Sequence, residues 1–274
     1  MNPIVLATDD IKRNLPPMLR PVATKWLINS LFRLLDIDKV NEIHAKYCHL
    51  RGAAFTSAML NDPMMDVRYE VHNREILDQL PDGAFLTVSN HPIGSLDGIA
   101  LIDLFASLRP DFKVMVNRIL SHISAMGDNF ISIVHKTVES REAMTNAAVI
   151  RLALTHLQEG HPLGFFPAGS MSFYNCRLKA VRDIPWSKSV IRLIRKTNAP
   201  VFPVFFDCLN SAGFYRVGRL SWKLRTLFVA REAFNKQGRT IDIYLRPPIM
   251  PEVIKSYKDD EALATFLYNM TYGL

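Results

Sequence analysis

The spacing of apolar residues along the chain is helical before residue 63 and alternates between strand and helix after it. A helix is predicted over residues 22–35, because apolar residues recur there every three or four positions along one face. Two further helices are predicted over residues 36–50 and 52–60, and an Asn-Asp-Pro turn ends the series. We therefore expect residues 1–62 to form an N-terminal amphipathic helical segment, whose apolar face suits either association with a membrane or packing on the protein's own core.

Short β-rich runs begin at residue 67 and alternate with helical stretches. The predicted strands cover residues 67–71, 84–89, 113–116, 130–134, 163–166, 201–206 and 241–245. The predicted helices between them cover residues 98–108, 140–158 and 187–196. This alternation is typical of an α/β fold, so we expect residues 63–274 to form one domain with a mostly parallel central sheet flanked by helices. Functional loops of such sheets lie at the carboxyl ends of the strands.

Composition and charge narrow the choice of partner and compartment. The 274 residues are 49% hydrophobic and carry a formal net charge of +7, which indicates an anionic partner such as lipid headgroups, an acidic carrier protein or nucleic acid. The alternative is a charge surplus that only aids solubility. Three scattered cysteines, Cys48, Cys176 and Cys208, support neither a disulfide framework nor a zinc site and fit a reducing cytoplasm. We expect neither a signal peptide nor a membrane span, so membrane contact would be peripheral.

The strongest candidate chemistry follows the predicted strand at residues 84–89. The chain continues as Asn-His-Pro-Ile-Gly-Ser-Leu-Asp, in which Pro92 keeps His91 extended and Gly94 permits a tight turn. This bend can bring Asp97 back to the His91 ring. A histidine can then take a proton from an alcohol, and a carboxylate on its other nitrogen fixes the tautomer. The alternative is an ordinary pair of surface or capping residues.

These residues resemble the glycerolipid acyltransferase superfamily, which includes the lysophosphatidate acyltransferases. The superfamily usually has four residues between the His and the Asp, whereas five separate His91 from Asp97 here. The longer spacing is similar to the branch of hemolysin-like and ornithine- or glycine-lipid O-acyltransferases. The resemblance implies that His91 is the general base, that Asp97 is its partner, and that Asn90, Gly94 and Ser95 bind substrate. It also implies an acyl thioester donor, acyl carrier protein or coenzyme A, with no cofactor and no metal.

Three further blocks extend the resemblance. Asn117 and Arg118 stand where the family has its acceptor-lining block, although an exposed arginine without a partner is an equally good interpretation. The block at residues 164–172 aligns with the family's Phe-Pro-Glu-Gly-Thr-Arg-Ser sequence. It adds five predicted substrate-binding residues, Pro167, Ala168, Gly169, Ser170 and Ser172. Without the resemblance this block is only a turn. The proline-rich strand at residues 199–206 is expected to be structural.

Two departures from the third block bear on the acceptor. Ala168 occupies the family's glutamate position and Met171 its arginine position. The resemblance associates those polar residues with the phosphate of lysophosphatidate. The hypothesis is therefore a lysolipid acceptor containing an amino acid, a lyso-glycine or lyso-ornithine lipid whose hydroxyl is acylated. The alternative is a 1-acylglycerol-3-phosphate acyltransferase that makes phosphatidate.

Basic residues and the helix at residues 22–35 predict a peripheral location at the cytoplasmic face of the inner membrane. Lysine and arginine recur in two stretches, the second of them interleaved with aromatic residues. They are Arg177, Lys179, Arg182, Lys188, Arg192, Arg195 and Lys196, followed by Arg216, Arg219, Lys223 and Arg225. They favour an anionic bilayer, and the alternatives are a solvated basic face or a non-enzymatic membrane or nucleic-acid binding protein. We expect no nucleic acid partner.

Competing enzyme classes find less support in the sequence. A serine hydrolase predicts a Gly-x-Ser-x-Gly elbow, and the Gly-Ser-Met-Ser run at residues 169–172 lacks the closing glycine. A metal hydrolase needs clustered ligands, whereas His44 and His49 are five positions apart on a predicted helix and the other histidines are scattered.

Overall fold

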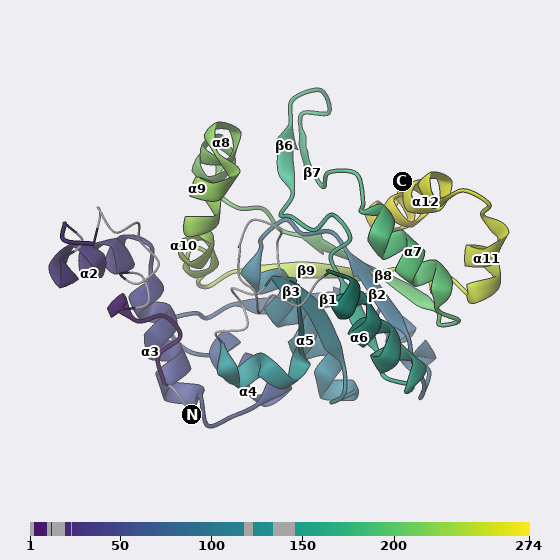
Figure 1. The fold of residues 1–274 in the computed structure, drawn as a ribbon, viewed down its shortest axis with the longest axis horizontal. Coiled ribbons are helices and arrows are strands. Elements are labelled where there is room, and N and C mark those ends of the chain that lie inside the picture. The colour runs from purple at the N-terminus through teal and green to yellow at the C-terminus, as the bar shows by residue number, and fades with distance from the viewer. Residues whose placement is uncertain (1–2, 10–11, 13–19, 23, 118–122, 134–145) are drawn as a thin grey trace.

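The computed structural model describes residues 3–9, 12, 20–22, 24–117, 123–133 and 146–274 (Figure 1). Its main sheet has seven strands in the order β1-β9-β8-β2-β5-β3-β4. Their bounds are β1 Arg68–His72, β2 Leu86–Ser89, β3 Lys113–Asn117, β4 Phe130–Ile133, β5 Leu163–Phe165, β8 Val201–Asp207 and β9 Thr240–Leu245. Neighbouring strands are parallel except for β8 and β9, so the predicted mostly parallel α/β sheet is confirmed.

Strand β2 lies at the centre of the sheet and begins level with both of its neighbours. Leu86 is aligned with Leu163 of β5 and with Val201 of β8. Because these three strands are parallel and in step, the loops that follow β2 and β5 leave the sheet at the same edge. The two best sequence motifs are therefore brought together there, as expected for an α/β sheet.

Helices cover both faces of the sheet, which explains why its central strand β2 is buried along its whole length. On one face, α3, α4, α5 and α10 pack in a cluster that includes Phe55, Phe105 and Phe206. On the other face, α6, α7, α11 and α12 pack in a cluster that includes Leu86 and Ile194. Figure 1 shows the second group on the opposite side of the sheet from α3 and α4. The helices on the two faces are α3 Ile37–Tyr47, α4 Gly52–Leu60, α5 Ser95–Leu108, α6 Asn146–Gln158, α7 Lys188–Lys196, α10 Val229–Phe234, α11 Pro251–Ser256 and α12 Asp260–Tyr272.

The N-terminal helices differ in how they are covered. Helix α2 (Lys25–Leu34) begins at Thr24, whose hydroxyl accepts a hydrogen bond from the backbone N–H of Leu27 at 3.2 Å. It buries Ile28 and Phe32 in a small separate cluster and leaves its apolar Trp26 76% exposed. In contrast, α3 and α4 contribute to the main core, and α4 packs against α5. The division at residue 62 remains a prediction, as does a membrane role for the segment before it.

Several elements were not predicted from the sequence. They are the 3-10 helices η2 (Arg74–Gln79) and η4 (Ser124–Asn129), the antiparallel hairpin of β6 (Phe173–Asn175) and β7 (Ala180–Arg182), α8 (Ala212–Leu220), α9 (Trp222–Leu227), α10, α11 and α12. Most are too short for a periodic pattern to stand out. The start of the helix predicted over residues 140–158 lies outside the described residues. In the described part of the chain, no helix combines the length and apolar character that crossing a membrane requires.

Candidate active site

The His91 and Asp97 side chains meet at the carboxyl end of β2. His91 Nδ1 lies 2.9 Å from Asp97 Oδ2. Asp97 is fully buried, whereas the His91 side chain is 19% exposed and can reach a substrate. Because a carboxylate only accepts hydrogen bonds, Nδ1 carries the proton in this pair and Nε2 holds a lone pair. The His91 ring also stacks on Phe166, with ring centres 4.2 Å apart.

The turn between β2 and α5 makes this contact possible. Gly94 has a φ of +98°, a conformation that side-chain-bearing residues rarely adopt, and it directly precedes α5. Asp97 lies in the first turn of α5, where Oδ2 accepts hydrogen bonds from the backbone N–H groups of Ile93 at 3.0 Å and Gly94 at 2.9 Å. A negative charge is also favoured at a helix N-terminus. Two local features of the sequence therefore position the Asp97 side chain, namely the tight turn at Gly94 and the start of α5.

Asn90 ties the start of this loop to the neighbouring strand. Its Nδ2 donates to the Phe206 carbonyl at 3.0 Å, and its Oδ1 accepts from the Phe206 backbone N–H at 2.7 Å. Both ends of the amide are therefore used to hold β2 and β8 together at the edge where His91 begins. The geometry gives Asn90 a positioning role, and its predicted contact with substrate remains a prediction.

The loop after β5 is bonded to the same histidine. The Ser172 backbone N–H donates to the His91 carbonyl at 2.8 Å, and Ser172 Oγ donates to Asp183 Oδ1 at 2.5 Å. Asp183 also accepts from the His91 backbone N–H at 3.3 Å and from Trp186 Nε1 at 3.2 Å. Burial raises the pKa of the Asp183 carboxyl, and the hydrogen bonds from Ser172 and His91 offset part of that rise. Asp183, which sequence analysis did not single out, therefore joins the two motif loops.

The other predicted site residues differ in exposure. Gly169 and Ser170 are exposed in the turn after β5, whereas Pro167 and Ala168 are buried. Ser95 is the half-buried first residue of α5. Asn117 is the last residue of β3, and Arg118 lies outside the described residues. The contacts of these residues with substrate remain predictions.

Arg225 does not belong to the exposed basic stretch in which the sequence placed it. It is buried, and its guanidinium donates to the backbone carbonyls of Ser172 at 2.9 Å and Met171 at 3.0 Å. Burial lowers the pKa of Arg225. Its guanidinium also lies 5.4 Å from the centre of the Phe214 ring. This interpretation of Arg225 as a surface cation was wrong, because α9 turns the residue inward onto the loop after β5.

A buried polar network supports the catalytic loop from the opposite side. Asn210 Nδ2 donates to the Ile93 carbonyl at 3.0 Å and to the Pro92 carbonyl at 3.3 Å. Lys236 Nζ donates to Asn210 Oδ1 at 3.0 Å and lies 3.5 Å from a carboxylate oxygen of Glu232. All these side chains are buried. The sequence offered no signal for this network, because Asn210 lies in a loop, Glu232 in a short helix and Lys236 in the turn after that helix.

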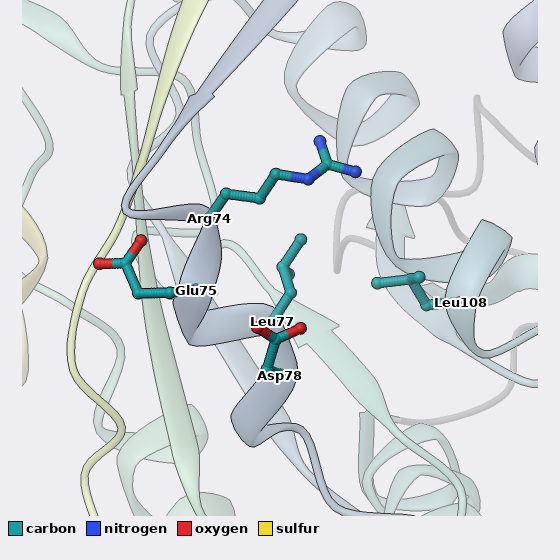
Figure 2. Close-up of a pocket in the computed structure, with 5 residues that line it drawn as sticks. All are labelled: Arg74, Glu75, Leu77, Asp78 and Leu108. Carbon is teal, nitrogen blue, oxygen red and sulfur yellow. The ribbon is translucent and has the colours of Figure 1, made fainter.

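One surface depression of the molecule lies away from His91. Figure 2 shows a depression of about 370 Å³ lined by side chains of η2 and the end of α5, namely Arg74, Glu75, Leu77, Asp78 and Leu108. Leu108 ends α5 and Asp97 lies in its first turn, so about 16 Å of helix separates them. Among the described residues, the one group with metal-ligand geometry is Glu70, His72 and Asp242 on strands β1 and β9. His91 and Asp97 remain the predicted site of the chemistry.

Comparison with known proteins identifies the family of the chain. The sequence profile of a family described as acyltransferase matches residues 8–272. The chain belongs to this acyltransferase family. The enzyme is 24% identical over 277 residues to a lyso-glycine lipid O-acyltransferase of Bacteroides thetaiotaomicron, and the match covers 98% of this chain and 97% of that one. It is 22% identical over 258 residues to a protein of the same name from Phocaeicola vulgatus, covering 91% of this chain and 88% of that one.

A solved structure is also similar to the enzyme. The 1-acyl-sn-glycerophosphate (LPA) acyltransferase PlsC from Thermotoga maritima matches with a TM-score of 0.48 and 14% identity, covering 90% of this chain and 93% of that one. The predicted superfamily and the predicted enzyme class, an acyltransferase, are confirmed by the family match and the two relatives.

Proposed function

We propose that the enzyme transfers a fatty acyl group from an acyl thioester to the hydroxyl of a lyso-amino-acid lipid, with glycine or ornithine as the amino acid. The observation that best supports acyl transfer is the hydrogen bond of 2.9 Å that Asp97 makes with His91, whose imidazole is partly exposed and can reach a substrate. This pair needs only an alcohol and an activated acyl group as reactants. Acyl carrier protein and coenzyme A are both candidate carriers of the thioester.

In the proposed reaction His91 acts as general base. Its Nε2 removes the proton from the acceptor hydroxyl while that oxygen attacks the thioester carbonyl carbon. The tetrahedral intermediate collapses by breaking the C–S bond, and the leaving thiolate takes the proton back from His91. Asp97 holds the imidazole through Nδ1 and stabilises the imidazolium that forms between these steps. One C–O bond replaces one C–S bond, and no proton is left over.

The acceptor assignment rests on what covers the start of α5. A Cβ atom added to Gly94 would lie 2.7 Å from Met171 Sδ, so the Met171 side chain packs directly over this helix N-terminus. A helix N-terminus is a ready site for a phosphate, but a thioether there offers it neither charge nor a hydrogen-bond donor. Ala168 is buried in the apolar cluster that includes Trp186 and Ile131. Both departures from the family's polar block therefore favour an acceptor without a phosphate at this point.

The names of two relatives agree with that choice. Both are lyso-glycine lipid O-acyltransferases, and the alignment of each spans nearly the whole of this chain. The specific acceptor of the present enzyme is part of the proposal, as is contact of the exposed Gly169 and Ser170 with substrate.

We also propose that the enzyme works as a peripheral protein at the cytoplasmic face of the inner membrane. Helix α2 supports this, since Trp26, Leu27, Leu31 and Leu34 are all exposed on it. Exposed leucine and tryptophan on an amphipathic helix suit the interface between headgroups and acyl chains. Helix α2 begins with Lys25 and carries a second basic residue, Arg33, in its last turn.

Purified enzyme tests the proposal with two acceptors and two donors. We expect acylation of a lyso-glycine or lyso-ornithine lipid and little product from lysophosphatidate, with acyl carrier protein and coenzyme A thioesters compared in parallel. His91→Ala should lower kcat by about 10²- to 10⁴-fold, because the general base is lost. His161→Ala is the matched control, since that histidine is bonded to Asp111, outside the site. A clear preference for lysophosphatidate would favour the phosphatidate-forming alternative, and unchanged transfer by His91→Ala would exclude the mechanism.

A further inference from the structure

A second exposed apolar surface, separate from α2, lies on α8, α9 and the β6–β7 hairpin. Leu220 is 86% exposed and Trp222 61%, and both lie where α8 meets α9. Leu178, between β6 and β7, is 63% exposed. Strand β6 lies against α8, and Figure 1 shows the hairpin and the helices projecting from the same side of the molecule. We name the surface made by Leu178, Leu220, Trp222, Leu224 and Leu227 the α8–α9 face.

The two segments that form the α8–α9 face carry basic residues and no acidic ones. The chain has no acidic residue between Asp207 and Glu232, and none between Glu159 and Asp183. The exposed basic residues of these two segments are Arg177, Lys179, Arg216, Arg219 and Lys223, together with Arg231 on α10, which donates to the Leu34 carbonyl. The Lys223 ammonium lies 5.8 Å from the centre of the Trp222 ring. Exposed apolar side chains among basic ones are typical of proteins that bind anionic bilayers.

The other basic stretch of the sequence, on α7, has a different environment. Arg192 and Arg195 each donate to Asp260 of α12 at 3.0 Å, and Lys188 lies 3.9 Å from Glu261. Acidic side chains of the protein itself therefore offset the charge of α7. Charge complementarity to an anionic surface selects the α8–α9 face.

Helix α9 also connects this face to the catalytic loop. While Trp222 and Leu224 point to solvent, Arg225 is buried and donates to the Ser172 carbonyl at 2.9 Å. The Ser172 backbone N–H in turn donates to the His91 carbonyl at 2.8 Å. A surface that contacts α9 is therefore linked to His91 through two successive hydrogen bonds, from Arg225 to Ser172 and from Ser172 to His91.

We propose that the α8–α9 face docks on an anionic bilayer, with Trp222 and the leucines among the headgroups and the basic side chains at the lipid phosphates. This deepens the proposed function and rests on it in one respect, because the lysolipid would reach His91 from the bilayer that holds α9. The exposed leucines and tryptophan favour a bilayer over an acidic carrier protein. The basic side chains alone would bind a carrier protein, so the apolar ones would have no role in that contact.

Vesicle binding by the full chain tests the face without any acyl transfer. We would measure co-sedimentation with vesicles of phosphatidylglycerol and phosphatidylcholine in equal parts, and with phosphatidylcholine alone. Arg219→Gln with Lys223→Gln should weaken binding to the anionic vesicles by about 25-fold, at roughly five-fold per basic residue. Leu220→Ser with Leu224→Ser should weaken it as well. Lys188→Gln with Arg192→Gln on α7, and Leu152→Ser with Met250→Ser, are matched exposed controls that should bind like wild type.

A second measurement separates this face from α2. Brominated acyl chains should quench the fluorescence of wild type more than that of Trp222→Phe, because Trp222 would lie at the bilayer while the apolar side chain is preserved. Equal quenching, or unchanged vesicle binding by both pairs of variants, would overturn the proposal. If the variants bound vesicles like wild type but lost acyl transfer only when acyl carrier protein was the donor, the face would be assigned to the donor. That result would also overturn the proposal. A short-chain acceptor dispersed in water should still be acylated by the folded variants, so failure of the docking face remains distinct from failure of the chemistry.

Discussion

The smallest unit that decides this active site is the contact between Gly94 and Met171. Gly94 supplies a φ of +98°, which lets the chain leave β2 and enter α5 within a few residues. Its missing side chain also leaves room for Met171, because an added Cβ would come within 2.7 Å of Sδ and 3.2 Å of Val229 Cγ1. One glycine thus sets the path of the His91–Asp97 loop and admits the thioether that we propose to disfavour a phosphate.

Gly94→Ala should therefore destabilise the enzyme and lower its activity together. The positive φ alone costs about 1–3 kcal/mol for a residue with a side chain, and the overlap with Met171 adds to that. Gly83→Ala is a matched control, since an added Cβ there meets nothing within 4 Å and φ is ordinary. Urea unfolding and kcat would be measured for both variants. Equal stability of Gly94→Ala and wild type would show that the loop can adopt another path.

At the scale of elements, α10 and the loop after β8 support the catalytic loop. Lys236 and Glu232 form a buried ion pair, and Lys236 also bonds to Asn210, which holds the Pro92 and Ile93 carbonyls. Burial raises the pKa of the nearby Tyr215 to about 12, so its hydroxyl stays protonated and donates to the Pro92 carbonyl at 3.3 Å. This network fixes the loop against which His91 must work.

Lys236→Met should be among the most destabilising single changes in this segment. It leaves the Glu232 carboxylate buried without its cation, for which the loss of unfolding free energy is about 3–5 kcal/mol. Adding Glu232→Gln should restore part of that loss, because the orphaned charge is removed. Lys255→Met is the control, as that lysine is exposed and bonds only to the Asn198 side chain. A single-variant effect as small as that of the control would mean that water reaches the pair.

At the scale of the whole molecule, an ionic contact joins the N-terminal helices to the α/β domain. Asp62 follows α4 and accepts hydrogen bonds from Lys46 at 2.6 Å, Tyr47 at 2.9 Å and the Met64 backbone N–H at 2.8 Å. Burial by itself raises the pKa of Asp62, but the bonds from Lys46, Met64 and Tyr47 outweigh it and hold the pKa below its usual 3.8. The carboxylate thus fastens α3 to the start of the α/β domain.

Acid should weaken this junction. A carboxyl whose pKa is lower in the folded state adds stability that is present above the unfolded pKa and is lost as pH falls through the folded pKa. The stability advantage of wild type over Asp62→Asn should therefore be constant near neutral pH and shrink below about pH 4. Urea unfolding of both proteins across that range measures it. Parallel curves for the two proteins down to strong acid would contradict the role of Asp62.

The seven main strands could be predicted from the sequence because each lies in a short run rich in apolar and aromatic residues. The central strand β2 is buried along its whole length, as expected for a sheet covered on both faces. The sequence also indicated that Asp97 turns back to the His91 ring, because a proline, a glycine and a helix start are all local signals, and the two side chains are in contact. It did not identify Asp183, Asn210 or Arg225 as parts of this region. Each of these contacts the catalytic loops from a distant point in the chain, and no local pattern reports such a contact.

The sequence by itself determined the α/β class, the acyltransferase family and the His91–Asp97 pair, because alternating apolar runs and motif spacing are properties of neighbouring residues. The tertiary structure alone decided which basic residues face outward. Arg225 is buried against the loop after β5, α7 is offset by acidic residues of α12, and the α8–α9 face keeps its charge. Charge along a chain records how many cations there are, whereas only packing determines which of them have partners inside the protein.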